Sequence, residues 1–279
     1  MFFASDDRPG IPGAPVDMTV NSTNHLIFTL IIAVPTVIAV GLAVRGMVRD
    51  RNFLWPILLL GGVIGILVEP ILDYMGGVWW PKDGDLEAFT ALGVNVPWFV
   101  VLVYPWILGW EAYYSYRVFA RGATRRQLWN LVALCSVIDI AIETVGIRAL
   151  GAYEYFGTQP LNPWGLPLWY VPCNALGSIV AGALVYGLRR RLHGVQMLMA
   201  MPLMPMSFAG VYGAIGWPCW VSLNSDWPLP VAHLCGLATF VMGGLIVTIM
   251  ADNLCVPDPA AEARRAGTTG EAELQRAPA

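Results

Sequence analysis

Residues 53–72, FLWPILLLGGVIGILVEPIL, decide the fold class of this chain. Glu69 is their only ionisable side chain. A helix of about 20 mostly apolar residues can cross the hydrocarbon core of a bilayer, where the backbone must satisfy its own hydrogen bonds. The stretch therefore predicts a transmembrane helix with a carboxyl group near one end.

Similar apolar runs recur along almost the whole chain. Of its 279 residues, 57% are hydrophobic and only 13% are charged, a balance outside the range of soluble proteins. The predicted spans are residues 25–44, 53–72, 97–119, 128–150, 167–188, 195–222 and 231–250. The fold class is thus all-α, a polytopic bundle of seven transmembrane helices. Three prolines, Pro202, Pro205 and Pro218, predict a kink or a partly re-entrant end in the sixth span.

Arginines set the predicted orientation. They gather after the first, third and fifth spans, as Arg45, Arg49 and Arg51, then Arg117, Arg121, Arg125 and Arg126, then Arg189, Arg190 and Arg191. By the positive-inside rule these connections are cytoplasmic, which places the N-terminus outside and the C-terminus inside. Residues 1–24 are then an extracytoplasmic tail, 25–250 the membrane domain, and 251–279 a disordered cytoplasmic tail.

Basic residues confined to connections give no reason to expect nucleic-acid binding. Lys82 is the single lysine beside many arginines, which is typical of a GC-rich bacterial genome. We therefore expect a multi-pass protein of a bacterial cytoplasmic membrane, with the lipid bilayer as its surroundings.

Two pairs of carboxylates interrupt the spans. Glu69 and Asp73, and again Asp139 and Glu143, are four residues apart, so each pair lies on one helix face. An Asp in the middle of a span costs roughly 2.5 to 3.5 kcal/mol on insertion scales, so we expect both pairs to face the bundle interior. Both pairs are predicted to lie in the outer half of the helix bundle. The alternative is a structural polar network, in which Glu143 or Asp73 holds Arg148.

Other residues are expected near the same depth. Asn174 lies about two turns into the fifth span, and residues 151–165, with Tyr153 and Tyr155, could form a lid. Asp226 precedes the last span, where an exposed Asp is more often simply solvated. Glu111 stands apart in the third span, and we expect it to pair with Arg117 or another residue on the cytoplasmic side.

Clustered carboxyl groups in a low-dielectric pocket cannot all ionise, so one of them can act as a general acid. Aromatic rings could stabilise a cation beside it, although each ring could equally belong to an interfacial belt. The predicted substrate-binding residues are Trp79, Trp80, Tyr153, Tyr155, Trp169 and Asn174.

Several known families of membrane proteins share some features with this chain but lack others. A microbial rhodopsin needs a lysine in its last helix, whereas Lys82 lies in a connection. Intramembrane prenyltransferases have more helices and a fuller Asn/Asp-rich first motif. Three scattered histidines argue against a histidine-rich metal centre, so we expect no metal and no cofactor.

In length, helix count and acidic residues near helix ends, the chain resembles the small seven-helix membrane terpene cyclases of meroterpenoid and indole-terpenoid pathways. The resemblance implies that an acidic residue of the second helix, and another late in the chain, protonate an epoxide or alkene. Glu69 in VEPILDY matches the first position, and Asp226 in NSDWPLP is the only late candidate. Asp139 and Glu143 have no counterpart in that family.

The resulting hypothesis is a metal-independent cyclase for a hydrophobic prenylated small molecule, with Glu69 as the proton donor. Glu143 or Asp226 would orient the acid or accept the final proton. The alternative is a proton-coupled transporter or a lipid-binding membrane protein that uses the same carboxylates. An odd number of helices and the lack of an inverted repeat favour the cyclase.

Overall fold

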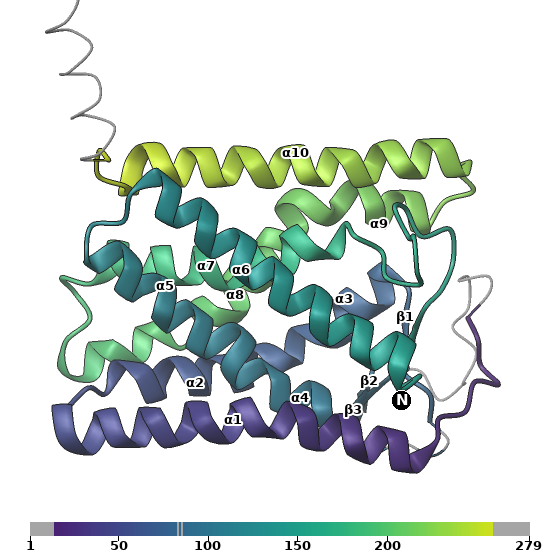
Figure 1. The fold of residues 1–279 in the computed structure, drawn as a ribbon, viewed down its shortest axis with the longest axis horizontal. Helices are drawn as coiled ribbons and strands as arrows, with labels where there is room; N and C mark the ends of the chain where they lie inside the picture. The colour runs from purple at the N-terminus through teal and green to yellow at the C-terminus, as the bar shows by residue number, and fades with distance from the viewer. Residues whose placement is uncertain (1–13, 83, 85, 259–279) are drawn as a thin grey trace, which may run out of the picture.

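The computed structural model describes residues 14–82, 84 and 86–258. The ends of the two predicted tails, residues 1–13 and 259–279, lie outside this range. The described chain is mostly helical, and its long helices lie side by side in one elongated bundle (Figure 1).

Six helical stretches of the described residues are long and apolar enough to cross a membrane. They consist of α1 (Ser22–Asp50); α2 (Leu54–Gly65) with η1 (Ile66–Val68) and α3 (Glu69–Gly76); α6 (Arg125–Thr144) with η3 (Val145–Ala149); α7 (Tyr170–Leu188); η4 (Gly194–Ala200) with α8 (Leu203–Val211), η5 (Tyr212–Gly216) and α9 (Trp217–Leu223); and α10 (Leu229–Leu254). Their bounds agree with the predicted spans to within six residues at each end. A helical bundle with the composition of a membrane protein is thereby confirmed.

The predicted third span is also helical from end to end. It is made of α4 (Trp98–Tyr104), η2 (Pro105–Trp110) and α5 (Glu111–Ala120), which run through the same bundle (Figure 1). Its tyrosines and Glu111 make it less apolar than the six stretches above.

Prolines and π-helical turns interrupt the long helices. Pro105 begins η2, and the two other π-helical segments, η3 and η5, continue α6 and α8. The predicted break in the sixth span is confirmed, because Pro202 and Pro218 stand at the starts of α8 and α9. Proline removes a backbone donor and so favours such interruptions.

Glycines let α2 pack closely against its neighbours. A Cβ atom on Gly62 would lie 2.6 Å from the carbonyl oxygen of Tyr104, and one on Gly109 would lie 2.7 Å from that of Leu58. Gly61 similarly faces Met201 and Met204. Small residues at such positions are the usual means of bringing membrane helices together.

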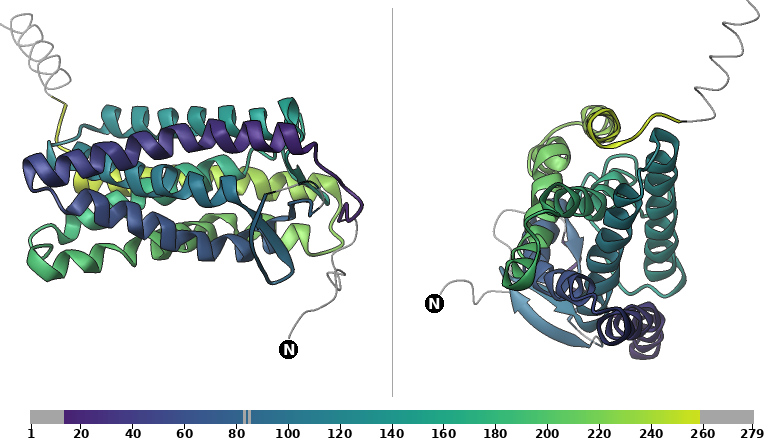
Figure 2. Two further views of the ribbon diagram at one scale, coloured as in Figure 1. Left: turned by 90° about the horizontal axis from the view of Figure 1, so that it is seen from below. Right: turned by 90° about the vertical axis from the view of Figure 1, so that its left-hand side faces the viewer.

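Two small antiparallel sheets, absent from the all-α expectation, lie at one end of the bundle. β1 (Val78–Trp79) pairs with β4 (Glu154–Tyr155), and β2 (Glu87–Ala91) forms a hairpin with β3 (Val94–Pro97). Leu92 and Gly93 both have positive φ, 52° and 74°, as a tight two-residue hairpin turn requires. Figure 2 shows this hairpin on the side of the bundle.

The two ends of the bundle differ in their connections. The α1–α2, α5–α6 and α7–η4 connections and the end of α10 lie at the left in Figure 1, and the strands lie at the right. The predicted arginine-rich connections therefore share one end, opposite the strands.

Candidate functional site

A cavity lies in the half of the bundle that is nearer to the strands. Its volume is about 80 Å³. Its polar lining residues are Glu69, Asp73, Tyr104, Glu143, Tyr153, Tyr155, Tyr170, Asn174 and Tyr212. Among the described residues no basic side chain lines it. The cavity therefore favours a neutral or cationic molecule over an anion.

Helix α3 contributes two carboxylates one turn apart. Glu69 is half-buried and accepts a hydrogen bond from the hydroxyl of Tyr104 on α4. Asp73 is 2% exposed and accepts a bond of 2.7 Å from the indole N–H of Trp80. Glu69 thus has a phenol as its partner, whereas Asp73 is held by an N–H group.

Helix α6 repeats this arrangement in the opposite order. Glu143 is half-buried and accepts a bond of 2.9 Å from the Tyr155 hydroxyl. Asp139 is 3% exposed and accepts a bond of 2.8 Å from the side-chain amide of Asn174 on α7. The Asn174 carbonyl oxygen in turn accepts from the Tyr212 hydroxyl, so α6, α7 and η5 are joined by one polar chain.

The connection between η3 and α7 covers the cavity. Its strand β4 pairs with β1, which places both Tyr153 and Tyr155 in the lining. Burial raises the pKa of the Tyr155 phenol well above its usual range, and the neighbouring Glu143 raises it further. Tyr155 therefore remains a hydrogen-bond donor to Glu143 across the physiological pH range. The connection that was expected to form a lid therefore contributes Tyr153 and Tyr155 to the cavity lining.

One polar atom of the lining lacks a partner within the described chain. The hydroxyl of Tyr170 is buried and makes no hydrogen bond. It occupies space left by Gly76, where a Cβ atom would lie only 1.7 Å from the Tyr170 oxygen. A buried hydroxyl without a partner costs free energy, so it is suited to bind a polar group of a ligand.

Aromatic rings fill much of the remaining wall. Trp80 packs against Tyr153 with ring centroids 4.5 Å apart and against Phe99 at 5.5 Å. On the opposite helices, Phe208 lies 5.5 Å from Tyr104 and 5.2 Å from Tyr212. The carboxylates are therefore surrounded by ring faces that can stabilise positive charge.

All three π-helical segments adjoin the cavity. η2 follows Tyr104, η3 begins two residues after Glu143, and η5 begins at Tyr212. Such insertions often occur at functional sites because they re-aim the neighbouring side chains.

Most predicted site residues meet at this cavity. Those in its lining are Glu69, Asp73, Trp80, Glu143, Tyr153, Tyr155 and Asn174. Asp139 lies behind the lining and reaches it through Asn174. Trp79 and Trp169 are buried but do not line the cavity: Trp79 packs against Phe156, and Trp169 donates to Gln159.

Asp226 is a predicted site residue that the structure does not bring to the cavity. It is exposed in the turn between α9 and α10 and is not among the cavity residues. Its catalytic role remains a prediction.

Two ion pairs considered from the sequence, Arg148 with Glu143 or Asp73 as the alternative reading and Glu111 with Arg117 as an expectation, are absent from the described residues. Arg148 is exposed, and Glu143 is held by Tyr155 instead. Arg117 donates to the Tyr113 hydroxyl at 3.1 Å, whereas Glu111 accepts a bond of 2.8 Å from Ser178. The polar contacts of this bundle are thus made mainly by hydroxyl and amide groups.

Three tyrosines of the lining were not among the predicted site residues: Tyr104, which binds Glu69; Tyr212, which binds Asn174; and Tyr170, whose hydroxyl has no partner among the described residues. Tyr104 and Tyr212 stand inside apolar runs, in VLVYPW and AGVYGA. A tyrosine inside a spanning helix needs a hydrogen-bond partner, so these two positions could have been identified from the sequence as candidates for polar contacts.

No protein-family model matches the chain, and no curated protein or solved structure matches it either. Among the described residues, no group of three or more His, Cys, Asp or Glu side chains could hold a metal ion.

Proposed function

We propose that the protein is an intramembrane cyclase that protonates an epoxide or alkene of a neutral polyprenyl substrate. One observation carries the proposal: Glu69 and Glu143 line the same aromatic cavity, each accepts a tyrosine hydroxyl, and no basic side chain is described beside them. Such a cavity favours a cationic intermediate and disfavours an anionic substrate such as a diphosphate.

In the proposed reaction Glu69 is the acid. Its carboxyl proton moves to the epoxide oxygen, the C–O bond breaks, and the π electrons of a neighbouring alkene form the new ring bond. The last carbocation loses a proton to the Glu143 carboxylate, so the product is an isomer of the substrate. A proton must then return from Glu143 to Glu69 before the next turnover.

The hydrogen bonds support these two roles. Donation leaves Glu69 negative, and the Tyr104 hydroxyl stabilises that charge. The rings of Trp80 and Phe99 lie on the same cavity wall, where each cation–π contact contributes about 0.5–2 kcal/mol. Asp73 and Asp139 act as positioning residues, because their partners, Trp80 and Asn174, belong to the lining.

We further propose that the stretch α4–η2–α5 is a seventh span. The arginine-rich connections would then be cytoplasmic, and the strands and the cavity would lie toward the outside of a bacterial cytoplasmic membrane. With seven spans the two termini would lie on opposite sides of the membrane. A prenylated substrate could reach the cavity from the bilayer.

The test uses membranes that contain the full chain and a linear polyprenyl compound with a terminal epoxide. The wild type should form a cyclic product of unchanged mass, identified by chromatography and ring-proton spectra. Glu69→Gln should lower conversion by about 100-fold or more, the usual contribution of a general acid. The matched control is Glu154→Gln, because Glu154 is an exposed glutamate of the lid. This variant should convert the substrate as fast as the wild type does. Unchanged conversion by folded Glu69→Gln would remove Glu69 from the mechanism.

A second candidate is a proton-coupled transporter. It is favoured by polar residues on successive turns of α6 and α7, where Asp139 binds Asn174 and, one turn further along α7, Ser178 binds Glu111. These groups extend the polar chain beyond the cavity. Proton uptake that depends on an added prenyl compound, measured with a pH dye in proteoliposomes, would favour transport over cyclisation.

A further inference from the structure

Two hollows between α5 and α6, separate from the acid cavity, together form one groove. One has a volume of about 270 Å³ and the other about 340 Å³. They share the lining residues Tyr114, Leu131 and Leu134, so they adjoin one another along the two helices. Tyr114 is 50% exposed and Leu134 is 51% exposed, which means that the groove opens on the side of the bundle.

One part of this α5–α6 groove is apolar. Trp106, Trp110, Leu134 and Ile138 line it, together with Pro35 of α1. Glu111, the one carboxyl group among the described residues that line it, already accepts a hydrogen bond from Ser178 of α7. This part is suited to hold a hydrocarbon chain.

The other part of the groove is polar and positively charged. Its lining contains Arg121, Gln127 and Asn130, and no acidic side chain among the described residues. The side-chain oxygen of Gln127 accepts from the backbone N–H of Thr124, which leaves its NH₂ group for a ligand. Gln127 is in the first turn of α6, where the helix dipole also favours an anion.

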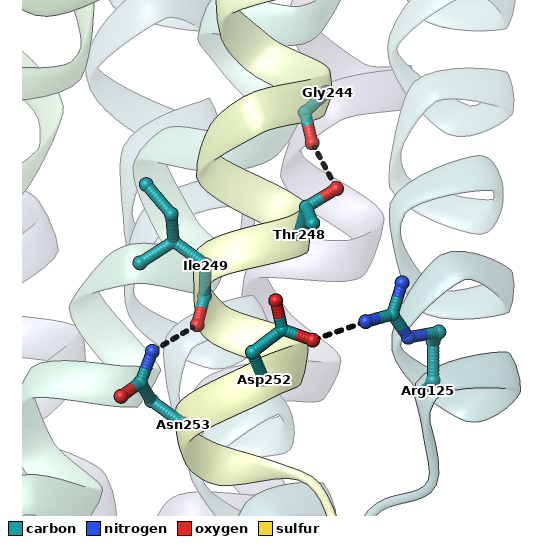
Figure 3. A network of polar contacts seen from close by, with 6 residues as sticks. All are labelled: Arg125, Gly244, Thr248, Ile249, Asp252 and Asn253. Carbon is teal, nitrogen blue, oxygen red and sulfur yellow. Dashed lines mark hydrogen bonds and ion pairs between the residues drawn. The ribbon is translucent and has the colours of Figure 1, made fainter.

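Neighbouring arginines are not equally available. Arg125 forms an ion pair with Asp252 near the end of α10, as Figure 3 shows. Arg121 makes no ion pair within the described part of the chain, and it stands at the C-terminal end of α5, where the groove ends. Arg121 is thus the arginine of this connection that both lines the groove and is free to bind an external anion.

We propose that the α5–α6 groove binds one anionic phospholipid of the surrounding membrane. Its phosphate contacts Arg121, Gln127 and Asn130, and an acyl chain lies against Leu131, Leu134 and Trp110. A membrane lipid is the occupant because the apolar part opens sideways on spanning helices, and the basic part lies at their ends, where headgroups are found. The site is independent of the proposed cyclisation, since it shares no lining residue with the acid cavity.

The test is lipid binding to the full chain in detergent, measured by native mass spectrometry. Phosphatidylglycerol and phosphatidylcholine with identical acyl chains are titrated separately. Arg121→Gln should weaken phosphatidylglycerol binding by about fivefold, the effect of one basic side chain near an anionic headgroup. Leu134→Trp, which fills the apolar part, should weaken binding of the same lipid by a similar factor.

Two matched controls separate this site from the general lipid belt. Arg190→Gln removes an equal charge from another arginine-rich connection, and Leu184→Trp enlarges an exposed leucine of α7. Both should bind phosphatidylglycerol as the wild type does. Equal binding of the two lipids by the wild type, or equal losses in the Arg121 and Arg190 variants, would overturn the proposal. Thermal unfolding of each variant shows that it remains folded.

Discussion

The carboxylate pairs of α3 and α6 each combine a half-buried glutamate with an almost fully buried aspartate. The glutamate comes first along α3 and second along α6. In each pair the glutamate is half-buried on the cavity wall and accepts a tyrosine hydroxyl. The aspartate of each pair is almost fully buried and accepts an N–H donor, from Trp80 or from Asn174. Under the proposed function this difference corresponds to two tasks: the glutamates exchange protons with a ligand, and the aspartates hold the lining side chains Trp80 and Asn174 in place.

The largest effect that tests this difference is expected when Glu143 and Asp139 of α6 are neutralised one at a time. We expect Glu143→Gln to lower conversion of the epoxide substrate by about 100-fold, because it removes the proton acceptor. Asp139→Asn should lower it by no more than about 10-fold, since Asp139 acts only through Asn174. Initial rates at saturating substrate measure both. Equal losses would mean that the two carboxylates do not have separate tasks.

The packing of the lining should be sensitive at Gly76. In Gly76→Ala the new methyl group would collide with the Tyr170 hydroxyl, so we expect the free energy of unfolding to fall by about 1–3 kcal/mol. Gly210→Ala is the matched control, because no atom lies within 4 Å of its Cβ position, and it should be neutral or stabilising by up to about 1 kcal/mol.

Thermal unfolding in detergent measures both glycine variants. Adding Tyr170→Phe to Gly76→Ala should recover part of the lost stability, because it removes the colliding oxygen. No recovery would show that the effect of Gly76→Ala does not come from Tyr170.

The tyrosine partners should matter less than the carboxylates. Tyr104→Phe removes the hydroxyl that stabilises ionised Glu69, and we expect about 10-fold lower conversion, as for the loss of one hydrogen bond to a charged group. Tyr114→Phe, a change at an exposed tyrosine of the α5–α6 groove, serves as the control. A loss as large as that of Glu69→Gln would instead point to Tyr104 as the proton donor.

The smallest effect is expected at Asp226. Because this residue is exposed in the α9–α10 turn, Asp226→Asn should change conversion by less than about twofold, as most surface substitutions do. The same rate measurement checks it. A large loss would restore Asp226 to the site and require the turn to move toward the cavity.

Helix positions were predictable because each span is a long apolar run, such as Ser22–Asp50 or Leu229–Leu254. The carboxylate pairs were predictable because charge inside such runs is costly, and this cost turns them toward the interior. Spacing alone also placed Glu69 beside Asp73 and Asp139 beside Glu143 on one face of each helix.

The partners of the carboxylates were not predictable from one helix at a time. Tyr104 of α4 binds Glu69 of α3, and Tyr212 of η5 binds Asn174 of α7, so both contacts depend on how separate helical segments are placed in the bundle. The pairing of β1 with β4, which brings Tyr155 to Glu143, joins residues more than 70 positions apart. The distance of Asp226 from the cavity was not predictable, because a position before a helix does not give the distance from the bundle centre.

Carboxyl labelling tests the central claim most directly, since it does not depend on the identity of the substrate. Dicyclohexylcarbodiimide is apolar and reacts with protonated carboxyl groups, so it should enter the cavity of the membrane-bound protein at neutral pH. Fragment mass spectrometry should locate the label on Glu69 or Glu143 and leave Asp73, Asp139 and the exposed Glu154 unlabelled. Absence of label from both cavity glutamates, in a protein shown to be folded, would contradict a proton-donating carboxyl group in this cavity.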